Sequence, residues 1–179
     1  MYTTGYSMGG GTTYWAFNGN PKMFAAAVSM AGNDVADFEG KDDLYVDADI
    51  PFMLLTSTGD IAGMNWNATD NCISDSFKAL FQNYLRYNEM DTFEYDTETY
   101  PLSGFKGDSY VEREINGEYM NYQWLLNNKD GVPMMGLNIT EYLPHGLYQE
   151  YAKLFWDFVK HYSRDLETGE VVYHPYLTR

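Results

Sequence analysis

The sequence predicts an α/β fold in which helices cover a mostly parallel sheet. Two short apolar segments, 24–30 and 51–55, show no polar alternation, which is typical of strands buried on both faces. Between residues 77 and 85, apolar side chains recur at three- and four-residue intervals and predict one face of a helix. Strands and helices that alternate along a chain form parallel sheets, because each helix carries the chain back across the sheet.

Length and charge limit the class of protein. The chain has 179 residues, enough for one domain with a sizeable core, and its formal net charge is −15. Such acidity argues against a nucleic-acid partner, since phosphate binding needs a basic surface. No run of about 18 apolar residues is present, so we expect no membrane span. Cys72 is the only cysteine, which excludes an internal disulfide and leaves the compartment, secreted or cytoplasmic, open.

The first half of the chain is expected to alternate between strand and helix. Residues 1–4 can form only the end of a strand, and 7–17 predict a helix that stops at the Gly and Pro residues of 18–21. Acidic residues dominate 33–49 and predict a solvated surface loop. The second apolar strand then runs into a polar turn at 57–60.

The second half begins with the amphipathic helix, for which polar residues at 74–76 offer N-terminal caps. Residues 92–131 look rich in β-structure, and Asn116-Gly117 lies between two alternating segments, a pattern typical of a hairpin. We interpret 92–131 as a β-hairpin insertion in a single, partial domain that spans 1–179.

The end of the chain predicts one more strand and one more helix. Residues 132–142 form the strand, which leads into Leu143-Pro144-His145. The apolar face of the last helix is expected to consist of Tyr151, Leu154, Phe155, Phe158, Val159 and Tyr162. A polar tail, 164–179, closes the chain.

Residues Gly5-Tyr6-Ser7-Met8-Gly9 match the Gly-x-Ser-x-Gly pattern of a nucleophile elbow. In this turn a serine lies between a strand and a helix, with its hydroxyl raised above the edge of the sheet. The turn is strained and crowded, so the positions two before and two after the serine must be small, as Gly5 and Gly9 are. The next residue, also glycine, gives the helix room to pass close to the strand. The pattern predicts acyl transfer with Ser7 as the nucleophile.

A serine hydroxyl is a poor nucleophile and needs a base and an orienting acid. In hydrolases with this elbow the three residues appear in the order serine, acid, histidine. Asp60 follows the second apolar strand, and we assign it the role of the acid, with Asp70 and Asp75 nearby as rivals. His145 follows the last strand and precedes the last helix, so we assign it the role of the base.

The remaining titratable residues predict no second site. His161 falls in the last turn of the expected helix, where an imidazolium suits the helix dipole, and His174 lies in the tail. The acidic residues at 42–49 lack the spacing and the central glycine of a calcium loop. With neither a glycine-rich phosphate loop nor a cysteine–histidine cluster in the sequence, we expect no metal and no cofactor.

Several segments resemble a known family. They are Tyr2-Thr3-Thr4-Gly5-Tyr6-Ser7-Met8-Gly9-Gly10, Pro21-Lys22-Met23-Phe24-Ala25-Ala26-Ala27-Val28, Leu143-Pro144-His145-Gly146, Trp156-Asp157-Phe158 and Tyr162-Ser163-Arg164. In this order they resemble the polyhydroxybutyrate depolymerase-like esterases, a group that includes feruloyl and acetylxylan esterases. The resemblance spans nearly the whole chain but covers only the second half of the family fold. The acid turn, Thr56-Ser57-Thr58-Gly59-Asp60, departs from it, because relatives carry His-Gly before the aspartate.

The resemblance implies an α/β-hydrolase that lacks its N-terminal strands. It also implies an oxyanion hole formed by the backbone N–H of Met8 and by a second donor from a loop early in the fold. We therefore expect Met1 to be an internal methionine of a longer protein, whose signal region would precede this sequence.

The motif and its expected partners predict a serine hydrolase, and the resemblance implies that it cleaves carboxylic esters of the feruloyl, acetyl or polyester type. Its substrate would be a small-molecule or polysaccharide-linked ester. A serine peptidase of the same fold, or a catalytically inactive carbohydrate-binding or interaction fragment, remains as an alternative.

Overall fold

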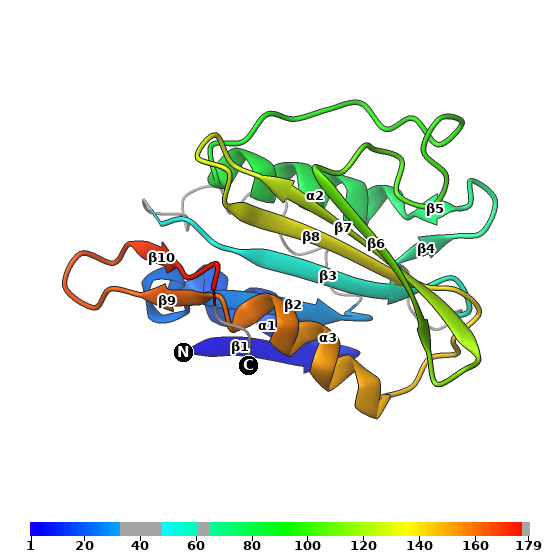
Figure 1. Ribbon diagram of the computed structural model, residues 1–179, viewed down its shortest axis with the longest axis horizontal. Coiled ribbons are helices and arrows are strands. Elements are labelled where there is room, and N and C mark those ends of the chain that lie inside the picture. Colours follow the sequence, from blue (N-terminus) through cyan, green and yellow to red (C-terminus); the bar gives the residue numbers. More distant parts are fainter. Residues whose placement is uncertain (33–47, 61–64, 177–179) are drawn as a thin grey trace.

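A computed structural model of the chain describes residues 1–32, 48–60 and 65–176. A six-stranded sheet with the strand order β1-β2-β3-β8-β7-β6 forms its centre (Figure 1). Its strands are β1 (Tyr2–Tyr6), β2 (Ala26–Met30), β3 (Phe52–Ser57), β6 (Ser109–Ile115), β7 (Tyr119–Asn127) and β8 (Pro133–Thr140). The strands β1, β2, β3 and β8 run parallel, while β7 and β6 are antiparallel additions. The prediction of an α/β fold with a mostly parallel sheet is confirmed.

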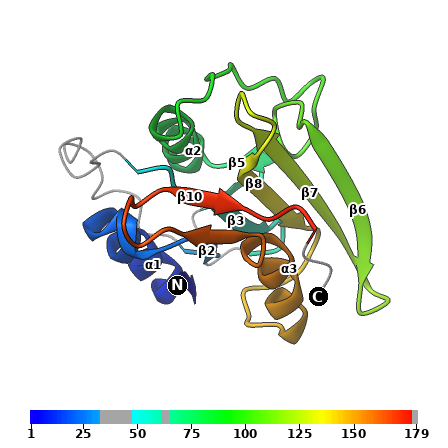
Figure 2. The same ribbon diagram turned by 60° about the vertical axis from the view of Figure 1, so that its left-hand side comes forward.

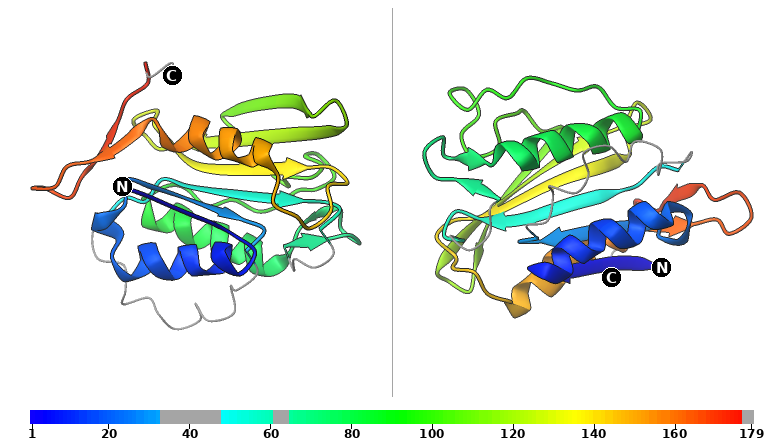
Figure 3. Two further views of the ribbon diagram at one scale, coloured as in Figure 1. Left: turned by 90° about the horizontal axis from the view of Figure 1, so that it is seen from below. Right: turned by 180° about the vertical axis from the view of Figure 1, so that it is seen from behind.

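Helices cover both faces of this sheet (Figure 3). The helices α1 (Met8–Gly19) and α2 (Asp75–Tyr87) lie on one face, and α3 (Gln149–Val159) lies on the other. A short 3₁₀ helix, η1 (Pro21–Met23), connects α1 to β2. None of the helices in the described ranges is long and apolar enough to cross a membrane.

Two apolar cores result from this layered arrangement. Successive residues of a strand point to opposite faces, so β3 contributes to both cores. Phe52 and Leu54 pack with the α1 and α2 side chains, whereas Met53 and Leu55 pack with those of α3. Every residue of β2 and β3 is buried, which explains why these segments carry no polar alternation.

The predicted face of α2 is confirmed. The five residues spaced at helical intervals are all buried: Phe77, Leu80, Phe81, Tyr84 and Leu85. Ser74 is the N-cap residue, although its side chain makes no capping hydrogen bond. Between β3 and α2 lies a two-stranded sheet of β4 (Trp66–Asn67) and β5 (Cys72–Ile73).

The hairpin predicted at Asn116-Gly117 is present, and it joins β6 to β7. Both turn residues have positive φ, 57° and 68°, as the tight hairpin turn requires. The expectation of β-structure from residue 92 onward is wrong for 92–108, which form no strand. Aromatic residues of this segment, Phe93 and Phe105, instead pack against the core around α2.

The C-terminal segment also differs from expectation. The helix α3 ends at Val159, so His161 is not in its last turn and Tyr162 is not on its face. Tyr162 begins β9 (Tyr162–Arg164), which pairs with β10 (Val171–Tyr173) to form a hairpin in place of a polar tail (Figure 2). The guanidinium of Arg164 anchors this hairpin, because it donates hydrogen bonds to three backbone carbonyls, those of Phe24, Asp49 and Gly169. Of the acidic loop expected at 33–49, residues 33–47 lie outside the described residues.

Candidate active site

Ser7 lies in a sharp turn between β1 and α1. Its backbone has φ 57° and ψ −121°, a strained combination for a residue with a side chain. The Ser7 N–H donates to the Met30 carbonyl at 2.9 Å, and the Ser7 carbonyl accepts from Gly11 N–H at 3.1 Å. These bonds attach Ser7 to the neighbouring strand β2 and to the helix α1, and they hold its backbone in the strained conformation.

The glycines around Ser7 are needed for different reasons. A Cβ at Gly5 would lie 2.0 Å from the Gly9 carbonyl oxygen, and one at Gly10 would lie 2.7 Å from Gly32 Cα. A Cβ at Gly9, by contrast, would meet nothing within 4 Å. The expectation that Gly9 must be small for its own side-chain space is therefore wrong, because it is the Gly9 backbone that crowds Gly5.

The structure brings together the three residues that the sequence singled out. The Nε2 atom of His145 lies 3.0 Å from Ser7 Oγ. The Nδ1 atom of His145 lies 2.9 and 2.8 Å from the two carboxylate oxygens of Asp60. Asp60 is only 4% exposed, whereas the His145 side chain is 27% exposed. The three side chains therefore form a row that runs from the buried Asp60 to the half-buried Ser7.

This arrangement determines the tautomer of the imidazole. A carboxylate can only accept hydrogen bonds, so the proton on the ring belongs on Nδ1, facing Asp60. The lone pair on Nε2 then faces Ser7 and can accept its hydroxyl proton. Chemically, the row can raise the nucleophilicity of Ser7 and can stabilise an imidazolium beside a negative charge.

The acid turn and the histidine loop are tied directly to each other. Ser57 Oγ donates to the Leu143 carbonyl at 2.5 Å, and Tyr142 N–H donates to Thr58 Oγ1 at 2.9 Å. These contacts cross between the ends of the neighbouring strands β3 and β8. They fix Asp60 relative to His145.

Tyr6 is a site residue that the sequence analysis missed. Its ring lies 4.9 Å from the His145 ring, with the two planes 37° apart. Burial raises the pKa of the Tyr6 hydroxyl to about 12, with smaller contributions from Asp60 and Tyr148. The residue is adjacent to Ser7 in the sequence, but its position against the imidazole depends on a loop more than a hundred residues away, which no local pattern could reveal.

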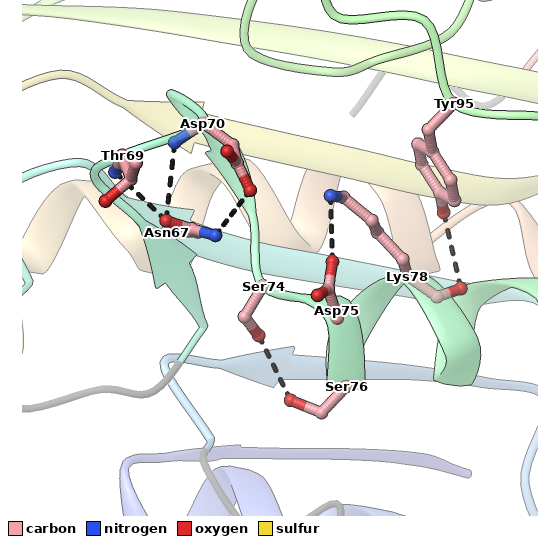
Figure 4. Close-up of polar contacts among 8 residues, drawn as sticks. All are labelled: Asn67, Thr69, Asp70, Ser74, Asp75, Ser76, Lys78 and Tyr95. Carbon is pink, nitrogen blue, oxygen red and sulfur yellow. Dashed lines mark hydrogen bonds and ion pairs between the residues drawn. The ribbon is translucent and has the colours of Figure 1, made fainter.

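The two rival acids are engaged elsewhere (Figure 4). Asp70 accepts a hydrogen bond from the Asn67 side-chain amide at 2.6 Å, and Asp75 pairs with Lys78 at 3.0 Å. Both aspartates are exposed and belong to the segment around β5 and the start of α2. Neither is bonded to His145, in contrast to Asp60.

The other two histidines form a separate contact in the C-terminal hairpin. The Nδ1 atom of His161 lies 2.8 Å from the His174 carbonyl oxygen, and Nε2 of His174 lies 2.8 Å from Ser163 Oγ. Their place in this hairpin leaves His145 as the histidine beside Ser7.

Met8 occupies the first position of α1, directly after the serine. The backbone N–H groups of the first helical turn have no partner within the helix and carry the positive end of its dipole. The Met8 N–H therefore belongs to a helix end that favours negative charge beside Ser7. The described part of the chain contains no group of three or more His, Cys, Asp or Glu side chains that could hold a metal ion.

No known protein family matches this chain in a scan of family profiles, and a search of curated proteins finds no relative of its sequence.

Proposed function

We propose that this chain is a serine hydrolase of α/β-hydrolase type that cleaves carboxylic esters. The observation that carries the proposal is the hydrogen-bonded row of Ser7, His145 and Asp60, with the serine in a strained turn at the start of a helix. The same three residue types in this geometry perform acyl transfer on unrelated folds, so the chemistry is tied to the site and not to ancestry.

In the first half of the reaction, Ser7 Oγ attacks the ester carbonyl while His145 Nε2 takes the hydroxyl proton. The negative charge that develops on the carbonyl oxygen is stabilised by the Met8 N–H at the positive end of α1. His145 then delivers the proton to the leaving alcohol, and an acyl group remains on Ser7. Asp60 keeps the imidazole in the required tautomer and stabilises the imidazolium between these two steps.

In the second half, water replaces the alcohol. His145 takes a proton from this water, which attacks the acyl carbonyl, and the proton then returns to Ser7 as the acid is released. We assign the substrate to neutral feruloyl, acetyl or polyester-type esters, in line with the resemblance to polyhydroxybutyrate depolymerase-like esterases. A net charge of −15 disfavours polyanionic substrates.

The test is a rapid-mixing assay with p-nitrophenyl acetate, combined with covalent labelling by a fluorophosphonate. We expect a burst of p-nitrophenol that matches the enzyme concentration, and one label at Ser7. Ser7→Ala should abolish both signals, while Ser76→Ala, which changes an exposed serine of α2, should leave them intact.

Two results would contradict the proposal. One is hydrolysis without a burst that survives in Ser7→Ala. The other is faster cleavage of a peptide p-nitroanilide than of the ester, which would make the protein a serine peptidase with the same row of residues.

A further inference from the structure

The β6–β7 hairpin and the loop that precedes it form a pocket of about 380 Å³. Its lining includes Tyr100, Phe105, Lys106, Tyr110 and Trp124, so it shares no residue with the row around Ser7. Small-molecule sites usually measure about 300–1,000 Å³ and combine apolar walls with a few polar groups. This pocket has the size and the composition of such a site.

Three aromatic rings lie side by side on the hairpin. Tyr110 and Trp124 are cross-strand partners, with ring centroids 5.4 Å apart. Tyr122 completes a triangle of rings, because it lies 6.1 Å from Trp124 and 6.5 Å from Tyr110, and its plane is within 14° of the Tyr110 plane. Tyr110 is 50% exposed, although a tyrosine can bury its ring where a core is available. Trp124 is 8% exposed and belongs to the core, so Tyr110 is the ring of this group that is exposed most and that lines the pocket.

Carboxylates flank these rings. Glu112 accepts a hydrogen bond from the Tyr110 hydroxyl, and Glu141 accepts one from the Tyr122 hydroxyl, both at 2.9 Å. Each carboxylate has further lone pairs that can accept hydrogen bonds from a ligand. Lys106 is exposed at the rim and can donate. The surroundings favour a ligand that is rich in hydroxyl groups, and the two carboxylates disfavour one that is itself negatively charged.

The pocket is held in shape before any ligand arrives. Phe105 stacks on Phe81 of α2, with centroids 5.5 Å apart and planes 27° apart. At the other end of the loop, Asp108 accepts a hydrogen bond from Asn127 N–H at 2.7 Å, and Asp108 N–H donates to the Leu125 carbonyl at 2.9 Å. A site fixed in this way loses little conformational entropy on binding, so even weak contacts with a ligand yield affinity.

We propose that this pocket binds a neutral sugar unit of a carbohydrate chain, with the sugar ring stacked on Tyr110. A pyranose ring presents C–H groups on its face and hydroxyls around its edge. The face suits an aromatic surface, where C–H groups make weak contacts with the π-system, and the edge suits the carboxylate of Glu112 and the ammonium of Lys106. This binding site stands apart from the proposed ester hydrolysis and does not depend on it.

Isothermal titration calorimetry with xylohexaose, cellohexaose and mannohexaose tests the proposal, with oligogalacturonate as an anionic comparison. We expect at least one neutral hexasaccharide to bind and oligogalacturonate not to bind. Tyr110→Ala should weaken the binding about tenfold or more, because it removes the exposed ring of the surface. Tyr110→Phe keeps the ring and should retain most of the affinity.

Matched variants test whether a loss of sugar affinity comes from the pocket or from another cause. Tyr176→Ala removes a tyrosine that is 90% exposed and lies outside the pocket, so its affinity should equal that of the wild type. Ser7→Ala should also bind normally, whatever it does to ester hydrolysis. Circular dichroism of Tyr110→Ala checks that the variant is folded, and Tyr110→Phe provides a second measurement if it is not.

Several outcomes would overturn the proposal. They are a lack of binding by all three neutral hexasaccharides, equal affinity in folded Tyr110→Ala, loss of affinity in Tyr110→Phe, tighter binding of oligogalacturonate, and loss of binding in Ser7→Ala, which would move the sugar to the serine site.

Discussion

The replacement Asp60→Asn tests the role of the buried acid. Both oxygens of Asp60 lie within hydrogen-bonding distance of His145 Nδ1, at 2.9 and 2.8 Å. An asparagine amide in either orientation therefore brings a donating NH₂ group, and not only an accepting oxygen, within reach of this nitrogen. Two donors cannot face each other, so the imidazole is expected to move its proton to Nε2. In that tautomer Nε2 has no lone pair for the Ser7 proton.

The size of the effect follows from the loss of the base. In hydrolases with the same three residues, an amide in place of the acid lowers kcat ~10⁴-fold, which corresponds to ~5.4 kcal/mol of transition-state stabilisation. We expect a loss of kcat of this order for Asp60→Asn, because the carboxylate is buried and solvent cannot easily take its place beside His145. Some activity above the uncatalysed rate should remain, since the Met8 N–H and substrate binding are unchanged.

The assay is the steady-state kcat for p-nitrophenyl acetate, measured for the wild type, Asp60→Asn and Asp70→Asn. Asp70 is the matched control, because it is an exposed aspartate whose hydrogen bond is to Asn67. Thermal melts should show that both variants are folded. If folded Asp60→Asn stays within tenfold of the wild type, or if Asp70→Asn falls as far, the assignment of the acid is wrong.

Three further predictions concern stability and ionisation. Gly5→Ala should lower the free energy of unfolding by ~1–3 kcal/mol or more, because the new Cβ would collide with backbone atoms. Gly9→Ala should change the free energy of unfolding by no more than ~1 kcal/mol, and urea unfolding of both variants measures the difference. Arg164→Lys should cost about 2 kcal/mol in the same assay, since an ammonium cannot reproduce three hydrogen bonds to carbonyls from one planar group. Burial, and then the Glu112 carboxylate, raise the pKa of Tyr110 to about 12 from the ordinary 10.0, so its contribution to stability is complete below pH 10 and is lost as the pH rises through about 12. Glu112→Gln should lower this pKa, as seen by titration of tyrosinate absorbance; an unchanged titration curve would exclude the carboxylate as a cause.

The parts of the fold that the sequence predicted well are those with a local cause. The five apolar residues of α2 share one helical face, and the Asn116-Gly117 turn needs positive φ at both positions, so neighbours along the chain were sufficient. Tyr162 shows where this reasoning fails. It continues the helical spacing of α3, but its ring packs 5.2 Å from Phe158 after the chain has already left the helix. Spacing alone cannot distinguish an apolar side chain that reaches this core from a strand from one that reaches it from the helix.

The same distinction between local patterns and long-range contacts applies to the candidate site. Ser7, Asp60 and His145 could be named because each follows a strand, and the carboxyl ends of parallel strands meet at one edge of a sheet. The contact between the Tyr6 and His145 rings could not be predicted, since it depends on the packing of distant segments. The grouping of aromatic rings on the hairpin could not be predicted either, because the sequence does not give the register that places Tyr110 opposite Trp124.

The bonds between the acid turn and the histidine loop join two of the three candidate residues, Asp60 and His145, and leave Ser7 apart from them. Hydrogen bonds join the segments of Asp60 and His145 at the ends of β3 and β8, whereas Ser7 follows β1, which β2 separates from β3. Small changes in the twist of the sheet therefore alter the gap between Ser7 and His145 before they alter the gap between His145 and Asp60. The strand β2 is the spacer for the serine, so under the proposed mechanism we expect repacking of its wholly buried side chains to change how readily Ser7 is activated while Asp60 and His145 stay aligned.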